Sequence, residues 1–252
     1  MKRLITGFMI ALLLIPACAF ARTLTFATDP FPPFYYEEDG TPKGIQYELA
    51  KIVFSKMQTR FKIVFVPWKR ALLMAESGKV DGVFGLRKTK ERLRWMIYPD
   101  EPLMEVNTVI FKRVDSPFEY TGISALKGKK IGIIKGYTYG KEFDESTLFK
   151  KEEVADLRHN FLKMLAGRID MVAAYRAVGI HVLNQMGLQG QIIPCPGKIH
   201  VSPLYIGFSK EPGNGKISRE FSRILNEFKK SDECKELMQR LDIPQELISP
   251  CQ

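Results

Sequence analysis

Residues 24–34, Leu-Thr-Phe-Ala-Thr-Asp-Pro-Phe-Pro-Pro-Phe, and residues 44–57, Gly-Ile-Gln-Tyr-Glu-Leu-Ala-Lys-Ile-Val-Phe-Ser-Lys-Met, decide the fold class. The first stretch predicts a short strand, 24–28, that stops at Asp29-Pro30 and runs into a loop held extended by Pro32 and Pro33. In the second stretch apolar residues recur at helical spacing, which predicts an amphipathic helix. The chain therefore opens with a strand followed by a helix.

The same alternation continues to the C-terminus. Gly78, Gly167 and Gly187 suit helix ends, Asn214 is a candidate N-cap, and a last cap is expected at Ser231 or Asp232. Alternating strands and helices predict an α/β protein with mostly parallel sheets covered on both faces. The further expected strands are 63–66, 80–84, 131–134, 169–173 and 205–209, and the further helices are 71–76, 161–166, 177–186, 217–228 and 234–241.

The first 21 residues have the pattern of a secretory signal peptide. Lys2 and Arg3 precede an apolar run, residues 4–16, and Ala19-Phe20-Ala21 offers a small-x-small cleavage site. A retained membrane helix is disfavoured because spanning a bilayer takes about 20 apolar residues. We expect a periplasmic protein cut after Ala21, and a lipoprotein anchored at Cys18 ranks second.

The charge balance is basic, with a formal net charge of +10, and 45% of the residues are hydrophobic. Lysines and arginines alternate with acids, as in residues 88–92, Lys-Thr-Lys-Glu-Arg, and no basic tract carries stacking aromatic residues. We therefore expect no nucleic-acid partner. The excess charge fits a solvated face best, and an anionic ligand or membrane surface second.

Cysteine usage predicts one disulfide in an exported chain. Cys195, Cys234 and Cys251 follow the cleavage site, and three pairings are open. We favour Cys234 with Cys251, which would pin the C-terminal tail to the last helix. The cysteines and the three histidines show no metal-ligand spacing, so we expect neither a metal nor a cofactor.

Three stretches together resemble the family 3 extracytoplasmic solute-binding proteins, the amino-acid receptors of ABC importers. They are residues 24–34 with 44–50, residues 66–71 with 77–85, and residues 89–92, Thr-Lys-Glu-Arg. The resemblance implies a type II periplasmic-binding-protein fold of two lobes joined by two crossing strands. Lobe one would hold residues 22–101 and 206–252, and lobe two residues 107–200, with the ligand between them at the C-terminal strand ends.

The resemblance also assigns ligand contacts. Arg92 matches the arginine that grips a ligand carboxylate, for which a planar guanidinium is suited. Gly85 matches a glycine whose backbone faces the ligand, and an ordinary turn glycine is the alternative. Phe34 and Trp68 match aromatic walls, with core packing as the alternative. Asp29 matches a polar position at the pocket mouth, or it caps the turn before Pro30.

Two positions depart from the family pattern. Arg87 stands where the family has a small hydroxyl residue, and Tyr175 stands where many amino-acid binders have the aspartate that neutralises the ligand ammonium. Arg87 beside Arg92 would suit a ligand with extra negative charge, unless Arg87 points away. Thr138, in the loop of residues 136–140, is a candidate hydroxyl donor.

The function expected from these residues is capture of a small anionic or zwitterionic solute, an amino acid or related carboxylate. The implied partner is an ABC permease in the inner membrane, and the protein is expected to be a monomer. A sensory receptor domain is the first alternative. The second is a cyclohexadienyl-dehydratase-like enzyme, for which Glu37 and Glu142 are the candidate acids.

Overall fold

The computed structural model describes residues 22–241 and 251. The expected signal peptide, the lipidation candidate Cys18 and residues 242–250 and 252 lie outside the described residues. Within the described part, no helix is long and apolar enough to cross a membrane. The strands form a 10-stranded sheet in the order β4-β1-β5-β12-β7-β10-β8-β9, with β6 beside β12 and β11 beside β7, and a separate hairpin, β2-β3.

The first lobe is built on three parallel strands. β1 (Leu24–Thr28) lies between β4 (Phe61–Phe65) and β5 (Gly82–Leu86). Parallel pairing requires crossovers, and helices provide them. The crossover helices are α1 (Ile45–Lys56) and α2 (Trp68–Glu76), and the C-terminal return adds α6 (Asn214–Lys229) and α7 (Asp232–Arg240). The smaller elements are β2 (Tyr36–Glu38), β3 (Thr41–Lys43), η1 (Arg92–Arg94) and β6 (Met96–Ile97).

The second lobe repeats this plan. β8 (Lys130–Ile134) pairs in parallel with β9 (Lys150–Val154) and with β10 (Met171–Tyr175). Residues of α4 and α5 pack with the inner strands in one apolar cluster. The remaining elements are η2 (Ile123–Leu126), α3 (Lys141–Glu145), α4 (Leu157–Leu165), α5 (Arg176–Met186) and β11 (Ile192–Pro194).

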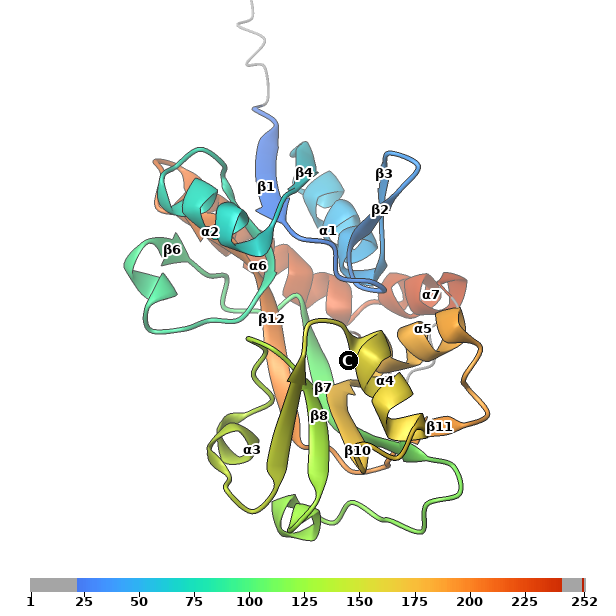
Figure 1. Cartoon of the computed structure of the whole chain (residues 1–252). Helices are drawn as coiled ribbons and strands as arrows, with labels where there is room; N and C mark the ends of the chain where they lie inside the picture. Colours follow the sequence, from blue (N-terminus) through green and yellow to red (C-terminus); the bar gives the residue numbers. More distant parts are fainter. Residues whose placement is uncertain (1–21, 242–250, 252) are drawn as a thin grey trace, which may run out of the picture.

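Two long antiparallel strands join the lobes, as Figure 1 shows. β7 (Met104–Arg113) and β12 (His200–Ser209) pair from His200 opposite Thr108 to Leu204 opposite Met104. Beyond that ladder β12 pairs with β5 of the first lobe, and β7 pairs with β10 of the second. The fold is therefore the two-lobed type II arrangement with two crossing strands that the family resemblance implied. The lobe boundaries at 22–101, 107–200 and 206–252 stay a prediction.

The expected elements are present within a few residues of their expected bounds, but strands β7 and β9 were not among those expected and one cap differs. Ser231 is the N-cap of α7, as expected. Asn214 was predicted to cap α6, but Gly213 is the N-cap and Asn214 is already helical. The Asn214 side chain is fully buried and donates to the Asp81 carbonyl, the Ser209 carbonyl and the Ser209 hydroxyl at 3.0–3.2 Å. Tertiary hydrogen bonding has replaced capping at this residue.

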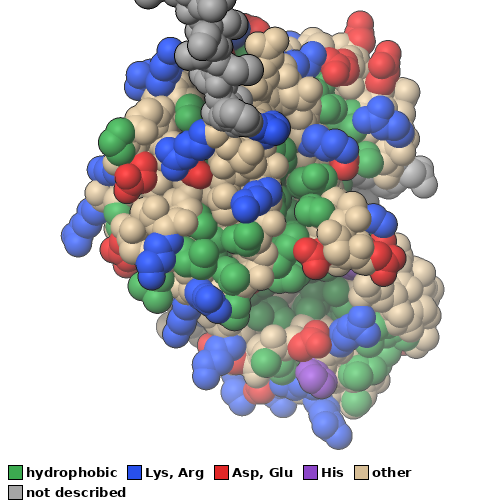
Figure 2. Space-filling view, turned by 90° about the horizontal axis from the view of Figure 1, so that it is seen from above, with side chains coloured by type: hydrophobic (Ala, Val, Ile, Leu, Met, Phe, Trp, Pro, Cys, Tyr) green, Lys and Arg blue, Asp and Glu red, His purple; other side chains and the backbone are tan. Residues whose placement is uncertain are grey.

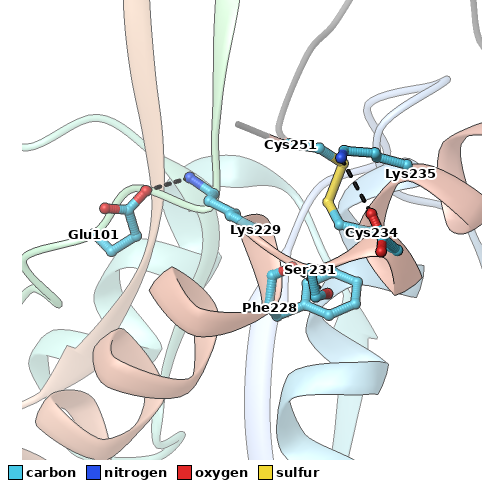
Figure 3. Close-up of a disulfide and its surroundings, with 8 residues drawn as sticks. Glu101, Phe228, Lys229, Ser231, Cys234, Lys235 and Cys251 are labelled. Atoms are coloured by element: carbon cyan, nitrogen blue, oxygen red, sulfur yellow. Dashed lines mark hydrogen bonds and ion pairs between the residues drawn. A yellow bond between two sulfur atoms is a disulfide. The ribbon is translucent and has the colours of Figure 1, made fainter.

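The C-terminal helix is tied down covalently. Cys234 in α7 forms a disulfide with Cys251, with the two Cα atoms 5.8 Å apart, and Cys195 is a buried free thiol. This is the pairing that the sequence analysis favoured. Nearby, Lys229 is buried at the end of α6, where its ammonium pairs with Glu101 (Figure 3). The same ammonium donates to the Pro102 carbonyl at 2.6 Å. The segment that leads into β7 is thus anchored to α6.

Replacing Asn214 tests the buried polar contact between α6 and the strands. Asn214→Ala removes three hydrogen bonds from a fully buried position, so we expect a loss of about 1–3 kcal/mol of unfolding free energy in urea titrations. Asn184→Ala, at an exposed position in a helix, is the matched control and should change it by no more than about 0.5 kcal/mol. Equal effects in the two variants would contradict the assignment.

Candidate functional site

Arg92 is held by an aromatic ring and a carbonyl instead of an acid. Its guanidinium carbon lies 5.5 Å from the centroid of the Trp68 ring, at the first residue of α2, in cation–π geometry. Its Nη1 donates to the Arg87 carbonyl at 2.9 Å, and the Tyr98 hydroxyl donates to the same carbonyl at 3.2 Å. Among the described residues, no carboxylate forms an ion pair with Arg92. The guanidinium is therefore oriented, but its charge is not neutralised.

Arg87 follows β5 directly and is partly buried. Burial raises the pKa of the Tyr175 phenol, and the nearby positive charge of Arg87 opposes that rise. Tyr175 is the last residue of β10 in the second lobe. The positive charge of Arg87 thus affects the pKa of Tyr175 across the interlobe space. Arg87 and Tyr175 are the two positions that depart from the family pattern.

An aromatic cluster joins the lobes. Phe31 of the first lobe packs against Tyr175 and Tyr137 of the second, with ring centroids 5.8 and 6.4 Å apart, and the two tyrosine rings are 6.3 Å apart. Phe34, the predicted aromatic wall, is only 1% exposed and stacks beneath Phe31 at 5.4 Å. Phe31 therefore presents the ring that Phe34 was expected to present. Both lie in the Phe-Pro-Pro-Phe loop, whose pattern cannot tell the buried ring from the interlobe one.

Asp29 lies near this cluster, where its charge acts on Tyr35 and Tyr137. It is partly buried, and burial raises the pKa of its carboxyl group. Burial also raises the pKa of Tyr137 to about 12, and the negative charge of Asp29 adds to that effect. The carboxylate is therefore close to Tyr137 of the opposite lobe, where it could meet a cationic group of a ligand.

The loop that contains Thr138 is held in place by hydrogen bonds of the neighbouring Tyr139. The buried Tyr139 hydroxyl accepts a hydrogen bond from the Ile134 amide at 2.7 Å, and the Tyr139 amide donates to the Asp144 carboxylate at 3.0 and 3.1 Å. Tyr137 and Thr138 are left exposed. A hydroxyl on a braced loop is well placed to contact a solute.

Gly85 is explained by a ring that packs against it. The Tyr35 hydroxyl donates to the Gly85 carbonyl at 3.2 Å, and a Cβ at Gly85 would come within 2.2 Å of the Tyr35 ring. The φ angle of +71° also favours glycine. Of the two backbone groups that the resemblance offers to the ligand, the carbonyl and the amide, the carbonyl is therefore already engaged by Tyr35.

No group of histidine, cysteine, aspartate or glutamate side chains that could hold a metal occurs in the part of the chain that the structure describes. The candidate acids Glu37 and Glu142 are exposed, one on the β2–β3 hairpin and one on α3. Figure 2 shows lysine and arginine side chains dispersed around a central apolar area on the face seen from above. The residues that the structure brings together are thus cations, aromatic rings and one partly buried carboxylate.

Two lobes, two crossing strands and charged and aromatic side chains at the facing strand ends define a two-lobed ligand-binding protein of the type II periplasmic class. Residues 24–241 match the model of the bacterial extracellular solute-binding proteins, family 3. The chain belongs to this family.

Two relatives come from Bacillus subtilis (strain 168). The probable amino-acid-binding protein YxeM is 22% identical over 217 residues, which cover 85% of this chain and 81% of YxeM. The arginine-binding extracellular protein ArtP is 25% identical over 216 residues, which cover 83% of this chain and 82% of ArtP. These names describe binding proteins.

Solved structures share the fold. Holo ArgBP from T. maritima aligns with a TM-score of 0.63 at 24% identity, covering 87% of this chain and 95% of that one. A histidine kinase sensor domain aligns at 0.68 and 19% identity, covering 87% and 95%. AncCDT-1, described as an ancestral amino acid-binding protein and a precursor of cyclohexadienyl dehydratase, aligns at 0.67 and 20% identity, covering 86% and 94%.

A substitution at Gly85 separates packing from ligand contact. Gly85→Ala should lower the unfolding free energy by about 2–5 kcal/mol without any ligand, because a side chain is strained at this φ and collides with Tyr35. Gly190→Ala, at a glycine with ordinary φ where an added Cβ would meet no atom within 4 Å, should have little effect. Thermal unfolding of both variants measures this. A stable Gly85→Ala protein would instead favour a role limited to ligand approach.

Proposed function

We propose that this protein captures a small amino acid or related carboxylate outside the cytoplasmic membrane and delivers it to an ABC importer. Family membership and the names of the relatives support amino-acid binding as the general class. The observation that carries the proposal is the oriented but unneutralised guanidinium of Arg92. A carboxylate ligand would supply the missing charge through two parallel hydrogen bonds.

The ligand pose follows from the contacts around Arg92. The face of Trp68 is occupied by the guanidinium, so we assign Trp68 to orienting Arg92 in addition to bordering the ligand. Thr138 of the opposite lobe would donate its hydroxyl to the same ligand as the lobes close, a hinge motion of the kind known for this class of protein. Gly85, with its carbonyl engaged, shapes the pocket floor.

The residues around the end of the ligand that lies away from Arg92 decide which class of solute fits. Arg87 and Tyr175 favour an anionic or neutral group where many amino-acid binders place an acid, and Asp29 is the carboxylate left to meet an ammonium. We therefore propose an anionic or zwitterionic solute. A basic amino acid such as arginine, named for ArtP and ArgBP, fits this arrangement less well because Arg87 would repel its side chain.

The cellular setting is part of the proposal. Export by the signal peptide of residues 1–21 would place a monomeric protein in the periplasm, beside a permease in the inner membrane. The sensor-domain neighbour makes ligand reporting to a membrane partner a second candidate, since the same clamp serves both roles. The AncCDT-1 neighbour makes a dehydratase a third candidate. That enzyme would need an enclosed acid, and Glu37 and Glu142 are both exposed. Prephenate turnover by the purified protein would support that enzyme.

The first test concerns Arg92. A thermal-shift screen of amino acids and dicarboxylates identifies a ligand, since one present at 100 times its Kd adds about 2.7 kcal/mol of stability. Arg92→Ala should then weaken binding by about 2–5 kcal/mol in calorimetry, because a desolvated anion loses its partner. Arg94→Ala is the matched control, as Arg94 lies in the same short helix but is exposed. Unchanged affinity in Arg92→Ala would contradict the pose.

The second test concerns the charge of the solute. If Arg87 contacts a second negative group, Arg87→Ala should lower the affinity for a dicarboxylate by about 2–5 kcal/mol and affect a monocarboxylate analogue much less. Calorimetry with matched ligand pairs measures the difference. A change within about 0.5 kcal/mol for both ligands would place Arg87 outside the contact shell.

A further inference from the structure

A separate cavity lies in the second lobe, beside β7. Its volume is about 260 Å³, and it is lined by Asn107, Val109, Arg176, Pro196 and Lys198. Arg176 is the first residue of α5, and Pro196 and Lys198 belong to the segment between β11 and β12. The cavity is therefore bordered by a strand, a helix N-terminus and a loop, and it opens to solvent at Lys198.

This cavity opens on the opposite face of the sheet from the aromatic cluster. Thr108 is directly paired with Tyr175 across β7 and β10, so their side chains lie on one face. Asn107 and Val109 flank Thr108, and successive strand residues point to opposite faces. Val109 accordingly packs with residues of α4 and α5. The cavity is thus distinct from the site that contains Phe31, Tyr137 and Tyr175.

The charged residues that line the cavity are both cations. Neither Arg176 nor Lys198 forms an ion pair within the part of the chain that the structure describes. The Nε atom of Arg176 is buried and has no hydrogen-bond partner there. The lining of the cavity therefore carries two positive charges without an acidic side chain beside them.

The backbone adds to the same electrostatic bias. The N-cap of α5, Tyr175, makes no side-chain capping bond, and the first turn holds no acidic residue. A helix N-terminus carries partial positive charge and free N–H groups that favour anions. The amide of Asn107 offers a further donor. The lining residues thus offer donors from three elements, and none of them is a carboxylate.

We propose that this cavity binds a small oxyanion, the chemistry shared by carboxylates, phosphate and sulfate, at a site separate from the solute cleft. Because one water occupies about 30 Å³ of liquid, the volume admits an anion of several heavy atoms. The bound anion connects the start of α5, strand β7 and the loop of residues 196–198, and so stabilises the second lobe by ligand linkage.

The test uses the full-length mature protein with sodium phosphate, sodium sulfate and sodium acetate as probes. Sodium chloride at equal ionic strength corrects for screening. We expect a saturable rise in Tm and a saturable heat in calorimetry with at least one probe, and the preferred probe identifies a tetrahedral oxyanion or a carboxylate. Absence of a saturable response with all three probes would overturn the proposal.

Variants of the lining residues test whether the oxyanion response arises in this cavity. Arg176→Gln and Lys198→Gln should each raise the Kd for the responding probe by about tenfold or more, since each removes a charge-assisted contact. Arg168→Gln, at an exposed arginine of the same lobe, is the matched control and should leave the Kd unchanged. Circular dichroism confirms folding, and Lys198, being exposed, can be replaced with little risk to the fold.

Arg92→Ala keeps this test independent of the proposed function. Arg92→Ala should weaken solute capture and retain the oxyanion response, whereas Arg176→Gln should weaken the oxyanion response and retain solute capture. A response that disappears in Arg92→Ala and persists in Arg176→Gln would overturn the proposal, because the oxyanion would then occupy the interlobe cleft. Equal weakening by Arg168→Gln would likewise overturn it and indicate nonspecific charge screening.

Discussion

The antiparallel ladder between β7 and β12 is the constraint on which the rest of the structure depends. From His200–Thr108 to Leu204–Met104 it holds the two strands in one register, while their far halves enter different lobes. That register sets where the end of β5 lies relative to the end of β10. Arg87 and Tyr175, which stand at those two ends, are therefore brought together by backbone pairing before any side chain contributes.

The interlobe face combines apolar contact with cations held by uncharged partners. Phe31, Tyr137 and Tyr175 contribute ring contacts across the lobes, and Tyr175 also packs in the apolar core of the first lobe. Arg92 is oriented by the Trp68 ring and a backbone carbonyl. An acid in the same place would hold the arginine as firmly but would neutralise it. Orientation without neutralisation leaves a cation ready for an anionic solute.

The sequence predicted the repeated units well because their periodicity is local. β1 begins and ends where expected, and α1, α5 and the cap at Ser231 agree with the apolar spacing and capping residues. Properties that depend on the packed structure were harder to predict. Nothing local distinguishes Phe31 from Phe34, and the glycine at position 85 is required by the distant Tyr35. Asn214 carries a capping residue's signature but donates to Asp81 and Ser209 instead.

The path of the chain, which leaves the first lobe through β7 and returns to it through β12, also affects the order of folding. The strand that pairs with β5 in the first lobe, β12, is supplied late in the sequence, and the Ser209 hydroxyl donates to the Asp81 carbonyl across a separation of 128 residues. Contacts of such high sequence separation close slowly because their loop entropy is lost before they form. The strands and helices of the second lobe lie wholly between these partners. The second lobe can thus fold first. Once it has folded, the effective loop that separates the two parts of the first lobe is shorter.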